Sequence, residues 1–358
     1  MKSKVVIGFI ALFVVLALVM PSLGFAKKSK VKEAVYTGPM ARQFDQTIAL
    51  SNGVSATITI VADQSQEELV LATISRLLGQ ASQLDAELNS PANGDIVRIN
   101  KLTNSQQAKI SNYTFDLISK AKNLAALTNG WFDIVATTDK GFFAPKDYRK
   151  LKLDQEEHTF AFKSKNMQLD MHNIWPAYLT DLLMQEIVKA GYANAKVEVG
   201  TTSKNVGKDI YTPWTVSIGL QETGGKSQYA HRTYAYSFTN KAVAELTPTS
   251  FAAPLIDPKS KKEVEANFRN VTVFAQDAMT AQALAIALYT IGPKGAVPFI
   301  EKHPEIKVIC VNNKGEFVTS KGLQINPYDH SANDLATTTA QDLGPTDQKL
   351  REKEELEN

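Results

Sequence analysis

Alternating apolar and polar positions in the first third of the chain predict a strand followed by a long helix. Residues 57–61, Thr-Ile-Thr-Ile-Val, are expected to form a strand. Residues 65–89 carry apolar side chains at spacings of three and four, which is typical of an amphipathic helix with one core-facing stripe. Ser65 and Glu68 match a capping box that would start this helix.

The same criteria predict elements further along the chain. A second amphipathic helix is expected over residues 105–127, and a third over residues 176–190, where Pro176 suits the first helical turn. Residues 232–238 and 241–246 are expected to pair as two strands, and residues 306–311 to form the last apolar strand.

The pattern around which the rest is organised lies at residues 255–292, and it predicts a turn, a strand and a helix. Asp257 and the proline after it start the turn, and residues 271–275 alternate as in a strand buried mainly on one face. A helix of small apolar residues is expected over residues 278–291, ended by Gly292. Its first turn would present free backbone N–H groups to an anion.

Composition and charge narrow the function classes. The chain has 358 residues, 44% of them hydrophobic, which suffices for one large core or two subdomains. A net charge of +2, which falls further if the leader lysines are removed, argues against a nucleic-acid partner or a basic membrane-surface role. The single cysteine, Cys310, lies in an apolar run and is expected to be a buried core residue.

The N-terminus has the pattern of a secretory signal. Two lysines precede the apolar run 5–20, and small residues end the leader at Ala26. Residues 1–26 are therefore predicted to be a cleaved signal peptide that directs the protein to a bacterial periplasm. The alternative is an uncleaved leader that anchors the chain in the inner membrane, which would be its only membrane contact.

The remaining boundaries follow from composition. Residues 27–45 are expected to be a tether, and residues 46–325 to form the folded domain, as one unit or two subdomains. Residues 326–358 are polar, lack a buriable stripe and are expected to be disordered.

The turn–strand–helix segment resembles the C-terminal signature of the FAD:protein FMN transferases, the ApbE-type flavinyltransferases. That family has a His-x-Ile-Asp-Pro-x-Thr-Gly turn, which matches here at Asp257, followed by a strand and a helix beginning Ala-Asp-Ala-Leu-x-Thr. Pro254 stands in place of the His, and Lys261 in place of the Gly. Gln282 replaces the Asp of the helix, and Ile286 replaces its Thr.

Three further segments resemble family motifs in the same order. Gly-Trp-Phe-Asp, ending at Asp133, is similar to the family's Gly-Ala-Phe-Asp. Tyr178 and Asp181 match a Val-Asp-Leu-Gly-x-Ile-Ala-Lys-Gly-Tyr-x-x-Asp motif, whose Ala-Lys-Gly is Trp-Pro-Ala here. Gly200 matches the first glycine of a Gly-Gly pair, and the second is replaced by Thr201.

The resemblance implies a fold and a chemistry. The fold would be α+β, with antiparallel-rich mixed sheets packed by four or five helices, and FAD and Mg²⁺ would be the cofactors. The positions equivalent to the family's cofactor-binding residues are Asp133, Tyr178, Asp181, Gly200 and Asp257. No metal ligand is assigned, because Gln282 and Ile286 replace the family's carboxylate and hydroxyl. His172 beside Asp170 offers two ligand types without a third.

Three functions therefore compete. In the family, FMN is transferred from FAD to a Thr of a partner protein, so the partner would be a periplasmic flavin acceptor or redox protein. The replaced ligands favour a catalytically impaired or inactive relative. The alternatives are an active, divergent flavinyltransferase and a non-enzymatic periplasmic module that binds a protein or a flavin.

Overall fold

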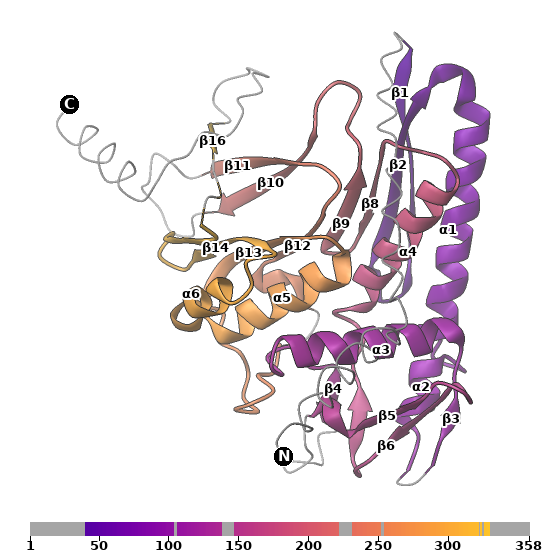
Figure 1. Ribbon diagram of the computed structural model, residues 1–358, viewed down its shortest axis with the longest axis vertical. Coiled ribbons are helices and arrows are strands. Elements are labelled where there is room, and N and C mark those ends of the chain that lie inside the picture. Colours follow the sequence, from indigo (N-terminus) through magenta and orange to yellow (C-terminus); the bar gives the residue numbers. More distant parts are fainter. Residues whose placement is uncertain are drawn as a thin grey trace, which may run out of the picture. The chain divides into compact units, whose positions relative to one another are not determined.

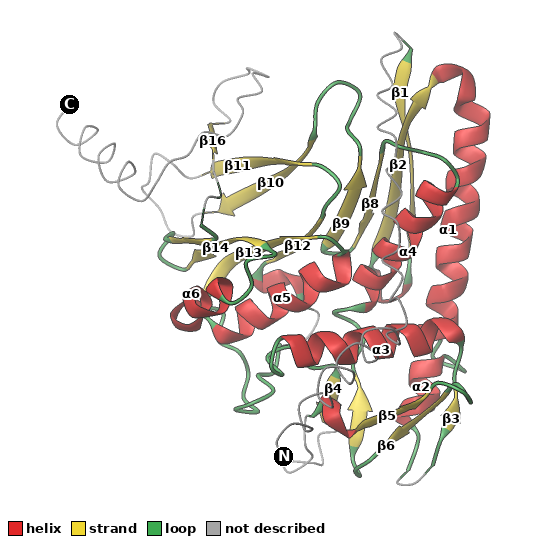
Figure 2. Cartoon of the chain, in the orientation of Figure 1, coloured by secondary structure: helices red, strands yellow, loops and turns green. Residues whose placement is uncertain are grey.

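The computed structural model describes most of the chain after the predicted leader (Figures 1 and 2). The described residues are 40–103, 106–137, 147–221, 231–251, 254–321, 323 and 326–329. The predicted signal peptide, residues 27–39 of the tether and residues 330–358 of the tail lie outside them. No helix of the described part is long and apolar enough to span a bilayer.

An eight-stranded sheet in the order β1-β2-β8-β9-β12-β13-β14-β15 forms the frame, and every neighbouring pair is antiparallel. Its strands are β1 (Ala41–Ala49), β2 (Ser55–Asp63), β8 (Ala195–Val199), β9 (Thr202–Val206), β12 (Ala242–Leu246), β13 (Phe268–Ala275), β14 (Lys307–Asn312) and β15 (Phe317–Thr319).

Three smaller sheets complete the strands of the described part. One contains β10 (Trp214–Gln221), β11 (His231–Phe238) and β16 (Asn326–Asp329). The others contain β3 (Ala108–Lys109), β6 (Thr159–Phe162) and β5 (Leu151–Asp154), and the pair β4 (Val135–Thr137) and β7 (Met167–Leu169).

The described part contains six α-helices: α1 (Glu67–Asn89), α2 (Asp95–Asn100), α3 (Asn112–Leu127), α4 (Trp175–Lys189), α5 (Ala278–Ile291) and α6 (Pro293–Glu301). Helices α1, α4, α5 and α6 contact the large sheet, whereas α2 packs on α1 and α3 packs on α5. Along the sheet, α1 packs on β1 and β2, α4 on β8 and β9, and α5 on β12 and β13 (Figure 2). Because α5 is small and apolar on nearly all sides, it lies between the sheet and α3 in the main core.

A second, smaller core lies on the other face of β12, β13 and β14. It joins Phe238 of β11 to Val243, Phe274 and Ile309 of the large sheet. Strand β13 is thus buried on both faces, since Val271 and its alternate neighbours face the main core. The one-sided burial expected for this strand is wrong, because the β10–β11 hairpin covers the second face.

The predicted fold class is confirmed: the protein is α+β with antiparallel sheets. The described part contains six α-helices rather than four or five. The helices α2 and α6 are too short to show the long apolar stripe by which a helix is predicted from sequence. The strand predicted at residues 57–61 lies within β2, and α5 has the predicted bounds. Cys310 is buried in β14, and burial raises the pKa of its thiol.

Two predicted starts are wrong for local reasons. The helix expected from residue 105 begins at Asn112, because the Ser111 hydroxyl accepts the backbone N–H of Thr114 and starts the helix there. The capping box at Ser65 does not form. Asp63 instead accepts the N–H of Ser65 in a 3-10 turn, and α1 starts at Glu67.

The predicted pairing of residues 232–238 with 241–246 is also wrong. Strand β11 pairs with β10 and β16, whereas β12 pairs with β9 and β13 of the large sheet. Asn240, at a left-handed φ of 54°, turns the chain so that the two strands enter different sheets.

Two domain boundaries need correction. The sequence predicts a tether that reaches residue 45, yet Ala41–Ala49 form β1, whose Phe44 is buried against the main core. The sequence predicts a disordered tail from residue 326, yet Asn326–Asp329 form β16, which pairs with β11. Both strands are short of apolar residues because each lies at the edge of its sheet. Residues 306–311 do form a strand, β14, but β15 and β16 follow it.

Candidate functional site

The first turn of α5 is occupied by carboxylates of the chain itself. Asp181 of α4 accepts the backbone N–H groups of Ala278 and Met279 at 3.0 and 3.1 Å. Asp277 accepts the N–H of Thr280 at 2.8 Å as the helix cap. The expectation that this turn offers free N–H groups to an anion is therefore wrong, because two internal carboxylates take them.

The charge of Asp181 is balanced inside the chain. The Lys204 ammonium of β9 lies 2.7 Å from its Oδ1, and both side chains are only one-fifth exposed. The carboxylate thus joins α4, α5 and β9 through three donors. This contact needs no external ligand to be satisfied.

The second turn of α5 is closed by an amide. Gln282 is 3% exposed, its Oε1 accepts from the Thr201 hydroxyl at 3.2 Å, and its Nε2 donates to the Asn173 carbonyl at 2.8 Å. Ile286, one turn on, is buried and contributes only carbon. The donor set does not fit Mg²⁺, which favours carboxylate and free oxygen ligands.

The turn between β8 and β9 packs tightly at Gly200. Gly200 has a φ of 57°, in the region that favours glycine, and an added Cβ would lie 3.5 Å from Pro176 and 3.6 Å from Val54. The proline that stands in place of the family's lysine therefore lies directly against the retained glycine. The space beside this backbone is filled by the chain.

Asp85 is a buried hub that the sequence did not single out. From α1 its carboxylate accepts the backbone N–H and hydroxyl of Ser51, the amide of Asn89 and the indole N–H of Trp175. Trp175 also belongs to the replaced Ala-Lys-Gly motif. The available signal was an acidic residue within an otherwise apolar helical face, since Asp85 follows Ala81 by four positions.

Two of the predicted cofactor positions serve internal contacts. Both oxygens of Asp133 accept backbone N–H groups, from Val135 at 2.9 Å and Tyr148 at 3.0 Å. The Tyr178 hydroxyl donates to Asp116 of α3 at 2.9 Å, and its side chain is 1% exposed. Burial, with this neighbouring carboxylate, raises the pKa of Tyr178.

The Asp257 turn has a lysine where the family has a glycine. Asp257 accepts the N–H of Lys259 at 2.8 Å, and Lys261 adopts a left-handed φ of 60° where the family has Gly. The Lys259 ammonium lies 3.7 Å from the centre of the Trp131 ring, and burial lowers its pKa. This contact brings the turn against the segment that ends in Asp133.

The predicted positions therefore fall into separate groups. Asp181 and Gly200 lie at α5, where Thr201 links the Gly200 turn to the helix, and Asp257 and Asp133 are joined through Lys259 and Trp131. Tyr178 instead contacts α3. His172 pairs with Asp170 at 3.0 Å, which raises the pKa of the imidazole. Within the described ranges, no group of three His, Cys, Asp or Glu side chains is placed to hold a metal ion.

Comparisons with known proteins show a likeness to one family. The ApbE family model matches residues 140–310. A curated FAD:protein FMN transferase of Haemophilus influenzae is 25% identical over 179 residues, which cover 48% of this chain and 51% of that protein. The match thus spans about half the length of this curated relative.

Solved structures show the likeness of the fold. The flavinyl transferase ApbE of Pseudomonas stutzeri, in its apo form, superposes with a TM-score of 0.67 at 19% identity, covering 78% of this chain and 95% of that one. ApbE of Vibrio cholerae gives 0.64 at 19% identity, over 78% and 98% of the two chains. The ApbE protein of Thermotoga maritima gives 0.63 at 19% identity, over 78% and 97%.

Proposed function

Since this chain belongs to the ApbE family, we propose that it is an exported relative of the FAD:protein FMN transferases that no longer transfers FMN. The observation that carries the proposal is the Gln282 side chain. Both ends of its amide are bonded within the chain, at the position where the family places a carboxylate.

The residues of this chain are poorly suited to the Mg²⁺ binding on which the family's chemistry depends. A divalent ion here would have to break the Thr201 hydrogen bond to reach a neutral amide oxygen, and Ile286 offers no second ligand. Without that ion, the negative charge of a pyrophosphate would face the Asp277 carboxylate at the start of α5, where Asp181 already takes two backbone N–H groups. Both effects disfavour FAD in the family's pose.

The walls of the cleft support the same proposal. Pro176 packs on Gly200, and Asp85 holds Trp175 at a position where the family has Ala, so a larger side chain occupies space that the small residue would leave open. The role that remains is non-catalytic, as a periplasmic module that binds a protein or a flavin. Its localisation is tested by the intact mass of the exported chain, which should begin at Lys27.

Covalent flavin labelling tests the loss of transfer. The wild-type protein is incubated with FAD, Mg²⁺ and an acceptor protein that carries a flavinylation Thr, and the denaturing gel is read for flavin fluorescence. The positive control is the Vibrio cholerae flavin transferase in the same reaction. We expect a labelled acceptor in the control alone, and robust labelling by this chain would overturn the proposal.

A further inference from the structure

Strand β1 leaves a long sheet edge uncovered in the part of the chain that the structure describes. It runs for nine residues and pairs there only with β2, without a bulge. Gln64 donates to the Met40 carbonyl and Leu50 donates to Val54, so the even-numbered residues bond towards β2. By alternation, the N–H and C=O groups of Gln43, Asp45, Thr47 and Ala49 point outward.

Such an edge is open to another strand. Proteins protect exposed edges with proline, lysine, bulges or a covering segment. Strand β1 contains no proline and no lysine, and its only charged residues are Arg42 and Asp45. An extended backbone is the one chemical group that satisfies a row of alternating N–H and C=O groups.

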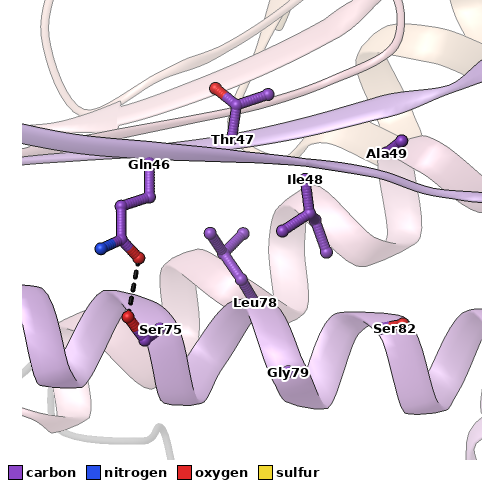
Figure 3. Close-up of a pocket in the computed structure, with 8 residues that line it drawn as sticks. All are labelled: Gln46, Thr47, Ile48, Ala49, Ser75, Leu78, Gly79 and Ser82. Atoms are coloured by element: carbon purple, nitrogen blue, oxygen red, sulfur yellow. Dashed lines mark hydrogen bonds between the residues drawn. The ribbon is translucent and has the colours of Figure 1, made fainter.

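A groove of about 630 Å³ accompanies this edge, between β1 and α1 (Figure 3). Gln46 and Ile48 point towards the helix, whereas Thr47 points away from it. The helix side is lined by small residues, Ser75, Gly79 and Ser82, at spacings of four and three. A Cβ at Gly79 would meet no heavy atom within 4 Å. The described chain therefore gives no packing reason for a residue that is unfavourable inside a helix.

The edge is complementary to itself. In an antiparallel pair of two β1 strands centred on Gln46, Phe44 lies opposite the partner copy's Ile48, and the two Gln46 residues, each accepting from its own Ser75 hydroxyl at 2.8 Å, lie opposite each other. On the other face, Asp45 lies opposite the partner copy's Thr47, so a hydroxyl meets a carboxylate. No like charges are opposed. The outward-pointing pairs, Asp45 with Thr47, are then the hydrogen-bonded ones.

We propose that two copies of this chain join through their β1 edges about a two-fold axis at Gln46. An isologous dimer needs one surface that complements itself, which β1 provides. The two large sheets become one sheet of twice the width, and the α1 helices meet on the same face. Close approach of two helices requires small residues, which accounts for Gly79 between Ser75 and Ser82.

Cysteine cross-linking tests the register. At the axis, the two Gln46 residues form a non-hydrogen-bonded pair with Cα atoms about 4.5 Å apart, a separation that a disulfide spans. Gln46→Cys should give a covalent dimer on mild oxidation, while the buried Cys310 stays unreactive. Thr47→Cys should not, because this register places Thr47 opposite the partner copy's Asp45 rather than opposite the partner copy's Thr47. A Gln46→Cys protein that remains monomeric under oxidation contradicts the register.

Mass in solution tests the dimer itself. By light scattering at about 100 µM, the purified protein should have twice the mass that it has in denaturant. Gln46→Lys places two ammonium groups at the axis, and Gly79→Leu fills open space that only a partner would occupy. Each should raise the dimer dissociation constant at least about tenfold. Gln185→Lys, at an exposed glutamine of α4, is the matched control and should change nothing.

Unchanged circular dichroism and a cooperative thermal unfolding transition would show that the variants fold. A wild-type protein with the mass of one chain overturns the proposal. So does a dimer that neither Gln46→Lys nor Gly79→Leu weakens, since such a dimer would use another surface.

Discussion

The first and second turns of α5 differ in what they have kept. In the first turn, Asp181 matches the family motif and holds the backbone N–H groups of Ala278 and Met279. In the second turn, Gln282 and the facing Thr201 replace family residues and bond to each other at 3.2 Å. The matched residue serves the backbone of its own chain, and the replaced ones occupy positions that would meet a ligand. Fold and ligand chemistry are therefore separable within this one helix.

The segment at Trp175, which differs from the family motif, is held as firmly as the first turn of α5, which is bonded to the matching Asp181. Asp85 holds Trp175, Asn89 and the Ser51 turn through four hydrogen bonds, and it is almost fully buried. Asp85→Ala should therefore lower the free energy of unfolding by about 4 kcal/mol, because four donors lose their acceptor. Urea denaturation measures this loss. Glu87→Ala, two residues on at an exposed position of α1, is the control and should be nearly neutral.

Removing the carboxylate of Asp181, which matches the family motif, should destabilise the protein slightly less than removing that of Asp85. Asp181→Ala leaves Lys204 without its partner and two helix N–H groups without an acceptor. We expect a loss of about 3 kcal/mol in the free energy of unfolding, measured in urea. Asp277→Ala removes only the side-chain cap of Thr280 and should cost about 1 kcal/mol. Equal losses for the two variants would contradict a special role for Asp181.

Restoring a carboxylate at the second turn should destabilise the protein. In Gln282→Asp, the shorter acidic side chain no longer donates to the Asn173 carbonyl, and a negative charge is buried. The free energy of unfolding should fall by about 2 kcal/mol at pH 8. The loss should be smaller at pH 5, because burial raises the pKa of the new carboxyl and its protonated form is neutral. A loss that is independent of pH would count against a buried charge.

The smallest effect concerns the Asp257 turn. Lys261 has a left-handed φ of 60°, and the family has Gly at this position. Lys261→Gly relieves the conformation of a residue with a Cβ but adds freedom to the unfolded chain, so stability should rise by less than about 1 kcal/mol. Lys261→Val, with a β-branched side chain at the same φ, should lower the melting temperature. If valine were tolerated as well as glycine, this turn would not constrain its backbone.

Elements with a regular pattern of buried residues and local end signals could be predicted from the sequence. Features that depend on contacts between residues far apart in the chain could not. The small apolar run of α5 gave correct bounds, since Asp277 and Gly292 mark its ends locally. The pairing of β11 was missed because adjacent strands usually pair, whereas here Asn240 sends them into different sheets. Strand β1 was assigned to a tether because an edge strand has few apolar residues.

The candidate site was predictable only in part for a related reason. The replacement of the family's carboxylate by Gln282 can be read from the sequence alone. Its partners cannot, because Thr201 and Asn173 lie 81 and 109 residues away and meet it only in the folded chain. Asp85 was missed because an acidic residue in a helix is usually a surface residue.

The dependence of FAD binding on Mg²⁺ tests the central claim most directly. The wild-type protein and the Gln282→Asp, Ile286→Thr double variant are titrated against FAD, with and without Mg²⁺, and binding is followed by quenching of flavin fluorescence. Mg²⁺ should leave the wild-type titration unchanged, because the Gln282 amide is bonded within the chain. The double variant should gain at most partial Mg²⁺-dependent binding, because Pro176 and Thr201 still fill the walls. Mg²⁺-dependent FAD binding by the wild type would contradict the account.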